Sequence, residues 1–161
     1  MAFNNTVLEE NLDLPAGEIL KASPHNVSAF DVFEDGLIEG RFAKYDTGSV
    51  DNLDGSATPV IAGIVRRKPT GEIGEGVYRT SGEGYDSVAE VINFGFATVA
   101  VAEGADPSKY DAVNVINAVD DEDNGLATDA AVATGIISAG DVVFWEEKQP
   151  GVWLVRINKF L

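Results

Sequence analysis

The sequence contains no cysteine and only one histidine, His25. Without cysteine the chain cannot form disulfides, thiolate metal sites or cysteine nucleophiles. His25 stands in the turn-like sequence Ser-Pro-His-Asn, and no glycine-flanked nucleophile motif surrounds the nearby Ser23 or Ser28. These absences predict a protein that is not an enzyme and that needs no cofactor or metal.

Basic residues are also scarce, since 11 lysines and arginines face 27 aspartates and glutamates, for a formal net charge of −16. A charge of this sign repels phosphate backbones and anionic lipid surfaces, so we expect neither nucleic acid nor a membrane as a partner. No apolar run approaches the roughly 20 residues of a membrane span, and no basic residue precedes Lys21. We therefore expect a protein that stays in the compartment where it is made.

Short apolar runs alternate with turn sequences such as Asp54-Gly55, Ala139-Gly140 and Pro150-Gly151. This pattern predicts an all-β fold, either a small β-barrel or a β-sandwich, preceded by an extended N-terminal arm. The predicted strands are 28–33, 37–45, 60–67, 76–79, 88–102, 112–116, 142–146 and 152–160. The segment 126–133 is the only one rich in helix formers, and it predicts at most one helix of about two turns.

The run from Val88 to Ala102 is apolar on both faces of the expected strand. Because side chains alternate along a strand, Ile92, Phe94 and Phe96 point one way, and Val91, Ala97 and Val99 the other. A strand with one solvent-exposed face would carry polar residues at every second position, so we expect both faces of this strand to be buried. The pattern leaves open whether the second cover is the protein's own interior or another subunit.

Residues 1–28 are predicted to form the arm, and residues 29–161 a single β domain. The arm has scattered apolar residues without a helical or alternating period, and an alternative reading places an ordinary first strand near residues 18–22. Its candidate partner-binding residues are Phe3, Val7, Leu8, Leu12 and Leu14.

Two charged clusters are candidate sites. Arg66, Arg67 and Lys68 form a basic cluster at the end of a predicted strand, suited either to local ion pairs or to an acidic partner. The acidic run from Asp120 to Gly125 has a glycine at the sixth position of a calcium loop, but Ala131 stands where that loop requires glutamate. A solvated turn is the simpler interpretation, with weak cation binding as the alternative.

Five segments of this sequence resemble the structural cement, or capsid decoration, proteins of tailed bacteriophages. The resemblance lies in their order: an entry strand reading GxxxGRF, an aspartate-and-glycine loop, a glycine-marked central strand and a closing tryptophan strand. The segments are Gly36 to Asp46 (GLIEGRFAKYD), Asp51 to Arg67 (DNLDGSATPVIAGIVRR), Asn93 to Val101 (NFGFATVAV), Asp123 to Thr128 (DNGLAT) and Gly151 to Ile157 (GVWLVRI).

The resemblance implies a β-rich protein without enzymatic activity that binds the outside of an assembled capsid and clamps neighbouring capsomers. Its implied partners are the major capsid protein and further copies of itself, as a dimer or trimer at local symmetry axes. Its implied location is the exterior of the virion, after synthesis in the host cytoplasm. A tail-tube or fibre-associated subunit and a ligand-binding β-barrel are the alternatives.

Overall fold

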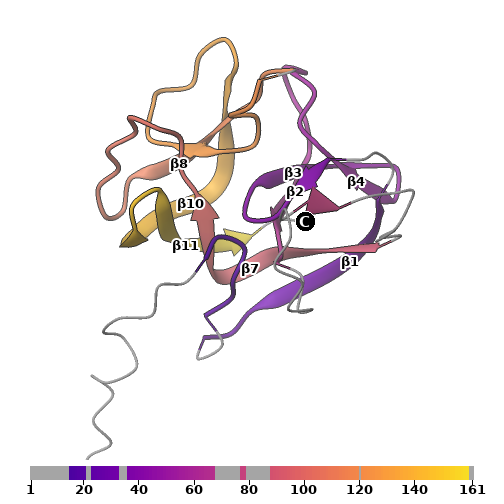
Figure 1. The fold of residues 1–161 in the computed structure, drawn as a ribbon, viewed down its shortest axis with the longest axis horizontal. Coiled ribbons are helices and arrows are strands. Elements are labelled where there is room, and N and C mark those ends of the chain that lie inside the picture. The colour runs from indigo at the N-terminus through magenta and orange to yellow at the C-terminus, as the bar shows by residue number, and fades with distance from the viewer. Residues whose placement is uncertain are drawn as a thin grey trace, which may run out of the picture.

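The computed structural model describes residues 15–20, 23–32, 36–67, 77–78, 88–119 and 121–159. These residues form strands, turns and loops and contain no helix, so the all-β prediction is confirmed (Figure 1). In the same residues there is accordingly no helix that is long and apolar enough to cross a membrane. The strands are β1 (Asn26–Val32), β2 (Leu37–Ile38), β3 (Phe42–Asp46), β4 (Ser49–Asp51), β5 (Ile61–Val65), β6 (Val77–Tyr78), β7 (Val88–Ala100), β8 (Ala112–Ile116), β9 (Ala127–Thr128), β10 (Ile136–Gln149) and β11 (Val152–Lys159).

Nine of these strands form one sheet in the order β1-β4-β3-β5-β7-β11-β10-β8-β9. Strand β1 pairs both with β4 and, antiparallel, with β7, which closes β1, β4, β3, β5 and β7 into a five-stranded barrel. Of the two predicted architectures, the barrel is therefore the one that forms. Strands β2 and β6 make a separate two-stranded sheet, in which Leu37 pairs with Tyr78.

Strand β7 belongs to two groups of strands at once. Its first half lies in the barrel, and its second half pairs with β11, which continues through β10 and β8 to β9. An isolated bridge between Val101 and Ala127 joins the end of β7 back to β9. Figure 1 shows the result, with the barrel on one side of β7 and the C-terminal strands on the other.

Along each edge of β7, one partner pairs with the first half of the strand and a second partner with the second half. On one edge, Glu90 accepts a hydrogen bond from the backbone of Arg66, and Phe96 and Thr98 bond to residues 17–20. Strands β1 and β11 lie on the opposite edge. Val91 and Ile92 of β7 pair with both β5 and β1, so these two strands lie on different edges of β7. Likewise Ala97 pairs with both Ile19 and β11. The backbone of β7 is thus bonded along both edges.

The side chains of β7 enter two hydrophobic clusters. The smaller cluster fills the barrel and includes Ala89 and Val91. The larger lies between the barrel strands and the C-terminal strands and includes Ile92, Ala97 and Val99. The predicted double cover of this strand is therefore mostly the protein's own interior. Phe94, which is 42% exposed, is an exception.

The turn and helix assignments need correction at two places. Residues 127–128 form strand β9, paired with Asn114 and Val115, so the short helix that the sequence allowed over 126–133 does not form. Pairing with β8 outweighs the weak helix propensity of this segment. The Ala139-Gly140 signal lies inside β10 rather than between strands. Gly140 has a φ of +85°, and the pairing of β10 with β8 shifts register between Ser138 and Val143, so the glycine marks a bulge.

Gly63 lies where β5 packs closely against β7 in the barrel. Its φ is +142°, and a Cβ added there would lie 2.3 Å from the backbone oxygen of Ile92 on β7. We expect Gly63→Ala to lower the free energy of unfolding by about 2 to 4 kcal/mol, because backbone strain and a backbone clash add. Gly48→Ala is the matched control, since its φ is +96° but nothing lies within 4 Å of the added Cβ. Chemical denaturation should show the larger loss for Gly63→Ala, and equal losses would contradict the packing argument.

Candidate binding surfaces

The basic cluster is divided between a local ion pair and an exposed side chain. Arg66 forms an ion pair with Glu90 of β7, and its backbone N–H also donates to the Glu90 carbonyl oxygen at 2.8 Å. Arg67 is exposed, while its backbone N–H donates to Gly17 at 2.9 Å. Lys68 lies outside the described residues. Of the two arginines of this cluster, Arg67 is therefore the one whose side chain is better placed to contact a partner.

The segment from Pro15 to Leu20 is held along one edge of β7 by backbone hydrogen bonds and by the side chain of Thr98. The Thr98 hydroxyl donates to the Pro15 carbonyl oxygen at 2.6 Å and accepts from the Glu18 N–H at 2.9 Å. Thr98 itself is fully buried, and Ile19 reaches the larger hydrophobic cluster. Hydroxyl bonds of this kind at a buried site are costly to lose, so this short segment is fixed to the domain.

A glycine of the entry strand makes this docking possible. Gly40 has a φ of +75°, and a Cβ there would lie 2.2 Å from the Cβ of Ala16. Its N–H donates to Val65 and its carbonyl oxygen accepts from Ala100, so it lies where the barrel meets the docked segment. The second glycine of the GxxxGRF pattern is therefore required by close packing.

The described part of the predicted arm packs against the domain. Residues 15–20 run along β7, and β1 begins at Asn26, before the expected boundary at residue 28. The arm residues Phe3, Val7, Leu8, Leu12 and Leu14 lie outside the described residues. The division of the chain into arm and domain stays a prediction.

The acidic turn is held by Arg41, the arginine of the same entry pattern. Its guanidinium donates to the backbone oxygens of Glu122 and, at 2.9 Å, of Asn124. Burial lowers the pKa of Arg41, an effect that the nearby Asp123 and Glu122 oppose. Throughout the described ranges, no group of three His, Asp or Glu side chains converges as a metal ion requires.

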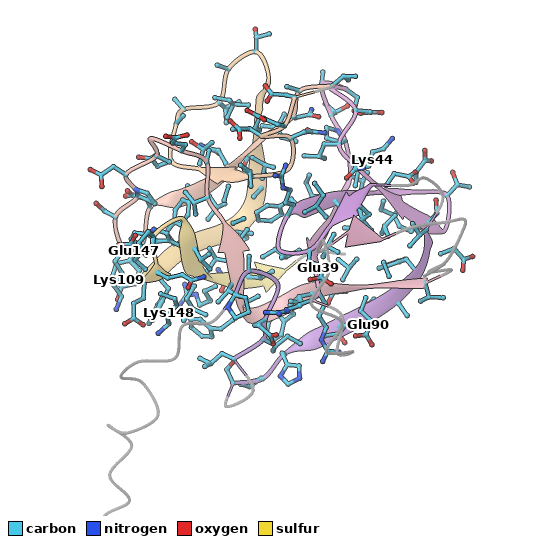
Figure 2. The ribbon with its side chains drawn as sticks, viewed as in Figure 1. Glu39, Lys44, Glu90, Lys109, Glu147 and Lys148 are labelled. Carbon is cyan, nitrogen blue, oxygen red and sulfur yellow. The ribbon has the colours of Figure 1, made fainter. Side chains whose placement is uncertain are left out.

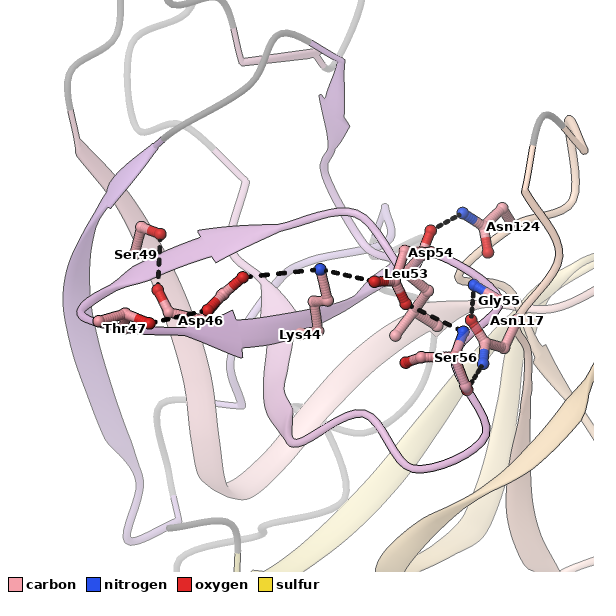
Figure 3. A network of polar contacts seen from close by, with 10 residues as sticks. All are labelled: Lys44, Asp46, Thr47, Ser49, Leu53, Asp54, Gly55, Ser56, Asn117 and Asn124. Carbon is pink, nitrogen blue, oxygen red and sulfur yellow. Dashed lines mark hydrogen bonds and ion pairs between the residues drawn. The ribbon is translucent and has the colours of Figure 1, made fainter.

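Beside this turn lies an open groove of about 580 Å³ between the barrel and the C-terminal strands. Figure 3 shows its polar network, in which Lys44 donates to Asp54 at 2.9 Å and lies 3.9 Å from Asp46. Asn117 accepts from the Gly55 N–H at 2.8 Å and donates to Ser56 at 2.7 Å. Two loops distant in sequence are thereby tied together.

The same contacts set the charge states in the groove. The hydrogen bond from Lys44 lowers the pKa of Asp54 far below its usual range, and the N–H and side chain of Ser56 add to the effect. The hydrogen bond to Asp54 in turn raises the pKa of Lys44, against a smaller effect of burial. The groove thus contains an ion pair between Lys44 and Asp54, and Asp46, Asp51 and Asp121 are among the other residues that line it.

Sequence reasoning missed Thr98, Lys44, Asp54 and Asn117. Each is a common surface residue type, and its role depends on a partner between 10 and 83 positions away. A spacing pattern within one segment carries no trace of such partners. Only the glycine and arginine of GxxxGRF gave a local signal.

Comparisons with known proteins agree with this geometry. The chain matches the family model described as XM1 gp53 minor capsid protein over residues 3–159. A chain in a solved structure of the capsid of Myoviridae phage XM1 is 66% identical, with a TM-score of 0.87 and full coverage of both chains. No curated protein matches the sequence.

These two matches identify the chain as a structural protein of the bacteriophage virion, a component of its capsid. The expected kinship with phage capsid proteins is thereby confirmed. More particularly, the chain belongs to the XM1 gp53 minor capsid protein family. Membership of a structural family fits the expectation of a protein without catalytic activity.

The Lys44–Asp54 pair predicts a defined pH dependence of stability. A carboxyl whose pKa is lowered by folding stabilises the protein above its unfolded pKa, near 3.8, and this contribution is lost as the pH falls through the lowered value. We therefore expect Asp54→Asn to be less stable than wild type at pH 6, and the difference to shrink below about pH 4. The loss should stay below about 1 kcal/mol, because the Asp54 side chain is 47% exposed.

Thermal unfolding of both proteins between pH 2 and pH 7 measures this difference. Asp129→Asn is the control, since Asp129 is exposed and belongs to none of the ion pairs recorded among the described residues. A difference between wild type and Asp54→Asn that stays constant across the whole pH range would show that the ion pair is not its cause.

Proposed function

We propose that the protein binds the outer surface of an assembled phage capsid and stabilises it by bridging neighbouring capsomers. The observation that carries this proposal is the full-length, 66% identical match to a chain of the phage XM1 capsid. One feature of the chain supports an exterior position. Its charge of −16 is unsuited to contact with packaged nucleic acid.

Attachment would use surfaces at one end of the barrel. Arg67 is exposed where its backbone bonds to Gly17, so it lies beside the segment that continues from the candidate arm. A basic side chain on the domain, together with the apolar residues in the sequence of the candidate arm, suits a capsid surface that presents both carboxylates and apolar grooves. The major capsid protein is the proposed partner.

The mechanism would be mass action. A ligand of the assembled state that does not bind the dissociated subunits stabilises the assembly by about 2.7 kcal/mol per site at a hundredfold excess over Kd. A capsid offers many equivalent sites, so small gains at each site sum to a large effect on the shell. No chemical step and no cofactor is required.

The arm can be tested by deletion of residues 2–14. The deletion leaves every described contact of Pro15 to Leu20 with β7, so we expect the thermal unfolding of the isolated protein to be nearly unchanged. Attachment to capsids that lack the protein should weaken, because the apolar arm residues are removed. Co-sedimentation with such capsids measures attachment. Equal losses in attachment and in stability would show that the arm belongs to the core of the domain.

The cement role itself predicts a change in the rupture temperature of the shell. Addition of the protein to capsids that lack it should raise this temperature, measured by calorimetry across a salt series. The increase should be larger at moderate salt, since screening reduces the repulsion between copies that each carry a charge of −16. No increase at any salt concentration would reject the cement role. An increase that fades steadily with salt would reject only repulsion as the dominant force.

A further inference from the structure

An aromatic and cationic patch lies on the outer face of the C-terminal strands. Val155 and Ile157 of β11 point into the larger hydrophobic cluster, so Arg156 between them points outward. Arg156 is in register with Phe96 of β7 and Val143 of β10, two strands that flank β11. With Trp145 of β10 and the loop before β8, these side chains form what we call the Trp145 patch, whose members are Phe96, Lys109, Tyr110, Trp145 and Arg156.

Trp145 is the centre of this patch. The Phe96 and Tyr110 rings meet it edge to face, with centroids 5.1 Å and 5.4 Å away. The Lys109 ammonium lies 4.2 Å from the centroid of the Trp145 ring, and the Arg156 guanidinium 5.6 Å from it. Two positive charges are thus collected on one aromatic ring, at distances where cation–π attraction acts.

Neither cation forms an ion pair with a carboxylate of the described residues. Lys44, Arg66 and Lys148 all form ion pairs, whereas no ion pair among the described residues involves Lys109 or Arg156. The Nε of Arg156 is buried and has no hydrogen-bond partner. In a chain with 27 acidic residues, such a pair of unmatched cations is a surface suited to an anionic partner.

The loop that carries Lys109 holds Tyr110 in a strained conformation. Tyr110 has a φ of +77°, which is rare for a bulky residue, and it is 62% exposed. Its N–H donates to Phe144 of β10 at 2.7 Å, and the Phe144 N–H donates back to Asp111 at 2.9 Å. Strain of this kind persists only where the surroundings fix it, and it concentrates at functional sites.

The complementary charge is present on the same molecule. Asp121 and Glu122 of the acidic turn are both exposed. Their carboxylates take part in none of the ion pairs of the described residues. Arg41 binds the backbone oxygen of Glu122, not its carboxylate. Figure 2 shows Lys109 on one side of the molecule and Lys44, which lines the groove beside this turn, on the other. The turn and the patch of one copy therefore do not meet each other.

We propose that the Trp145 patch of one copy binds the acidic turn of a second copy. Lys109 and Arg156 would pair with Asp121 and Glu122, and the aromatic rings would shield these pairs from water. Because the two surfaces differ and lie apart, the contact is heterologous, and repetition of it generates a ring where the rotation closes. The use of this ring on a capsid rests on the proposed function, whereas the contact itself exists without a capsid.

A charge-swap experiment on the full chain tests the contact. Sedimentation velocity over a concentration series, at about 0.15 M salt to screen long-range repulsion, should show that the wild type self-associates. Lys109→Glu and Asp121→Lys should each raise the Kd of self-association at least about tenfold, because each places like charges opposite one another. An equimolar mixture of the two variants should associate again, since each supplies the surface that the other has lost.

Two further variants make the test decisive. Arg67→Glu changes the charge by the same amount as Lys109→Glu on a different surface, and it should leave self-association unchanged while it weakens attachment to capsids. Tyr110→Gly keeps the loop, since glycine takes a φ of +77° without strain, and it should weaken self-association through the lost ring. Circular dichroism checks that each variant is folded.

Three results would overturn the proposal. They are a wild type that remains monomeric at every concentration, a mixture that associates no better than its two components, and folded Lys109→Glu and Tyr110→Gly variants that associate like wild type. Because capsid attachment is measured separately, a monomer that still binds capsids would reject this contact and leave the proposed function standing.

Discussion

The fold depends on the fact that β7 is shared. This strand completes the barrel with its first half and begins the C-terminal group of strands with its second, and its side chains enter both hydrophobic clusters. Neither group can release β7 without exposing the core of the other. The two clusters therefore form one cooperative unit, and the larger one also takes in Phe42 of β3 and Ile64 of β5.

The surface is organised around the same shared strand. The docked segment from Pro15 to Leu20 lies on one edge of β7, and Phe96 on its outer face touches Trp145. The groove with the Lys44–Asp54 pair and the Arg41-held acidic turn lies where the barrel meets the C-terminal strands. The described surfaces of the proposed contacts with the capsid and with a second copy are thus attached to strands of one continuous sheet.

The sequence predicted the all-β class, and its apolar run located β7, because alternation along one strand is a local property. It did not decide between a barrel and a sandwich, since the closing pair of β1 with β7 joins residues between 57 and 68 positions apart. For the same reason it indicated Arg66 to Lys68 as a basic cluster but not the ion pair of Arg66 with Glu90. The Trp145 patch was missed because Lys109 and Tyr110 stand in a loop, 35 or more positions before the other cation and the central tryptophan.

The two-edged pairing of β7 limits how this family can change in length. Insertion or deletion of one residue within Val88–Ala100 would exchange the two edges, and also the two faces, for every residue beyond that point. This strand therefore does not tolerate a change of length. Turns such as those at Gly104, Gly135 and Gly151, where an added Cβ meets nothing within 4 Å, are the places where a phage lineage can lengthen the chain or display a foreign peptide.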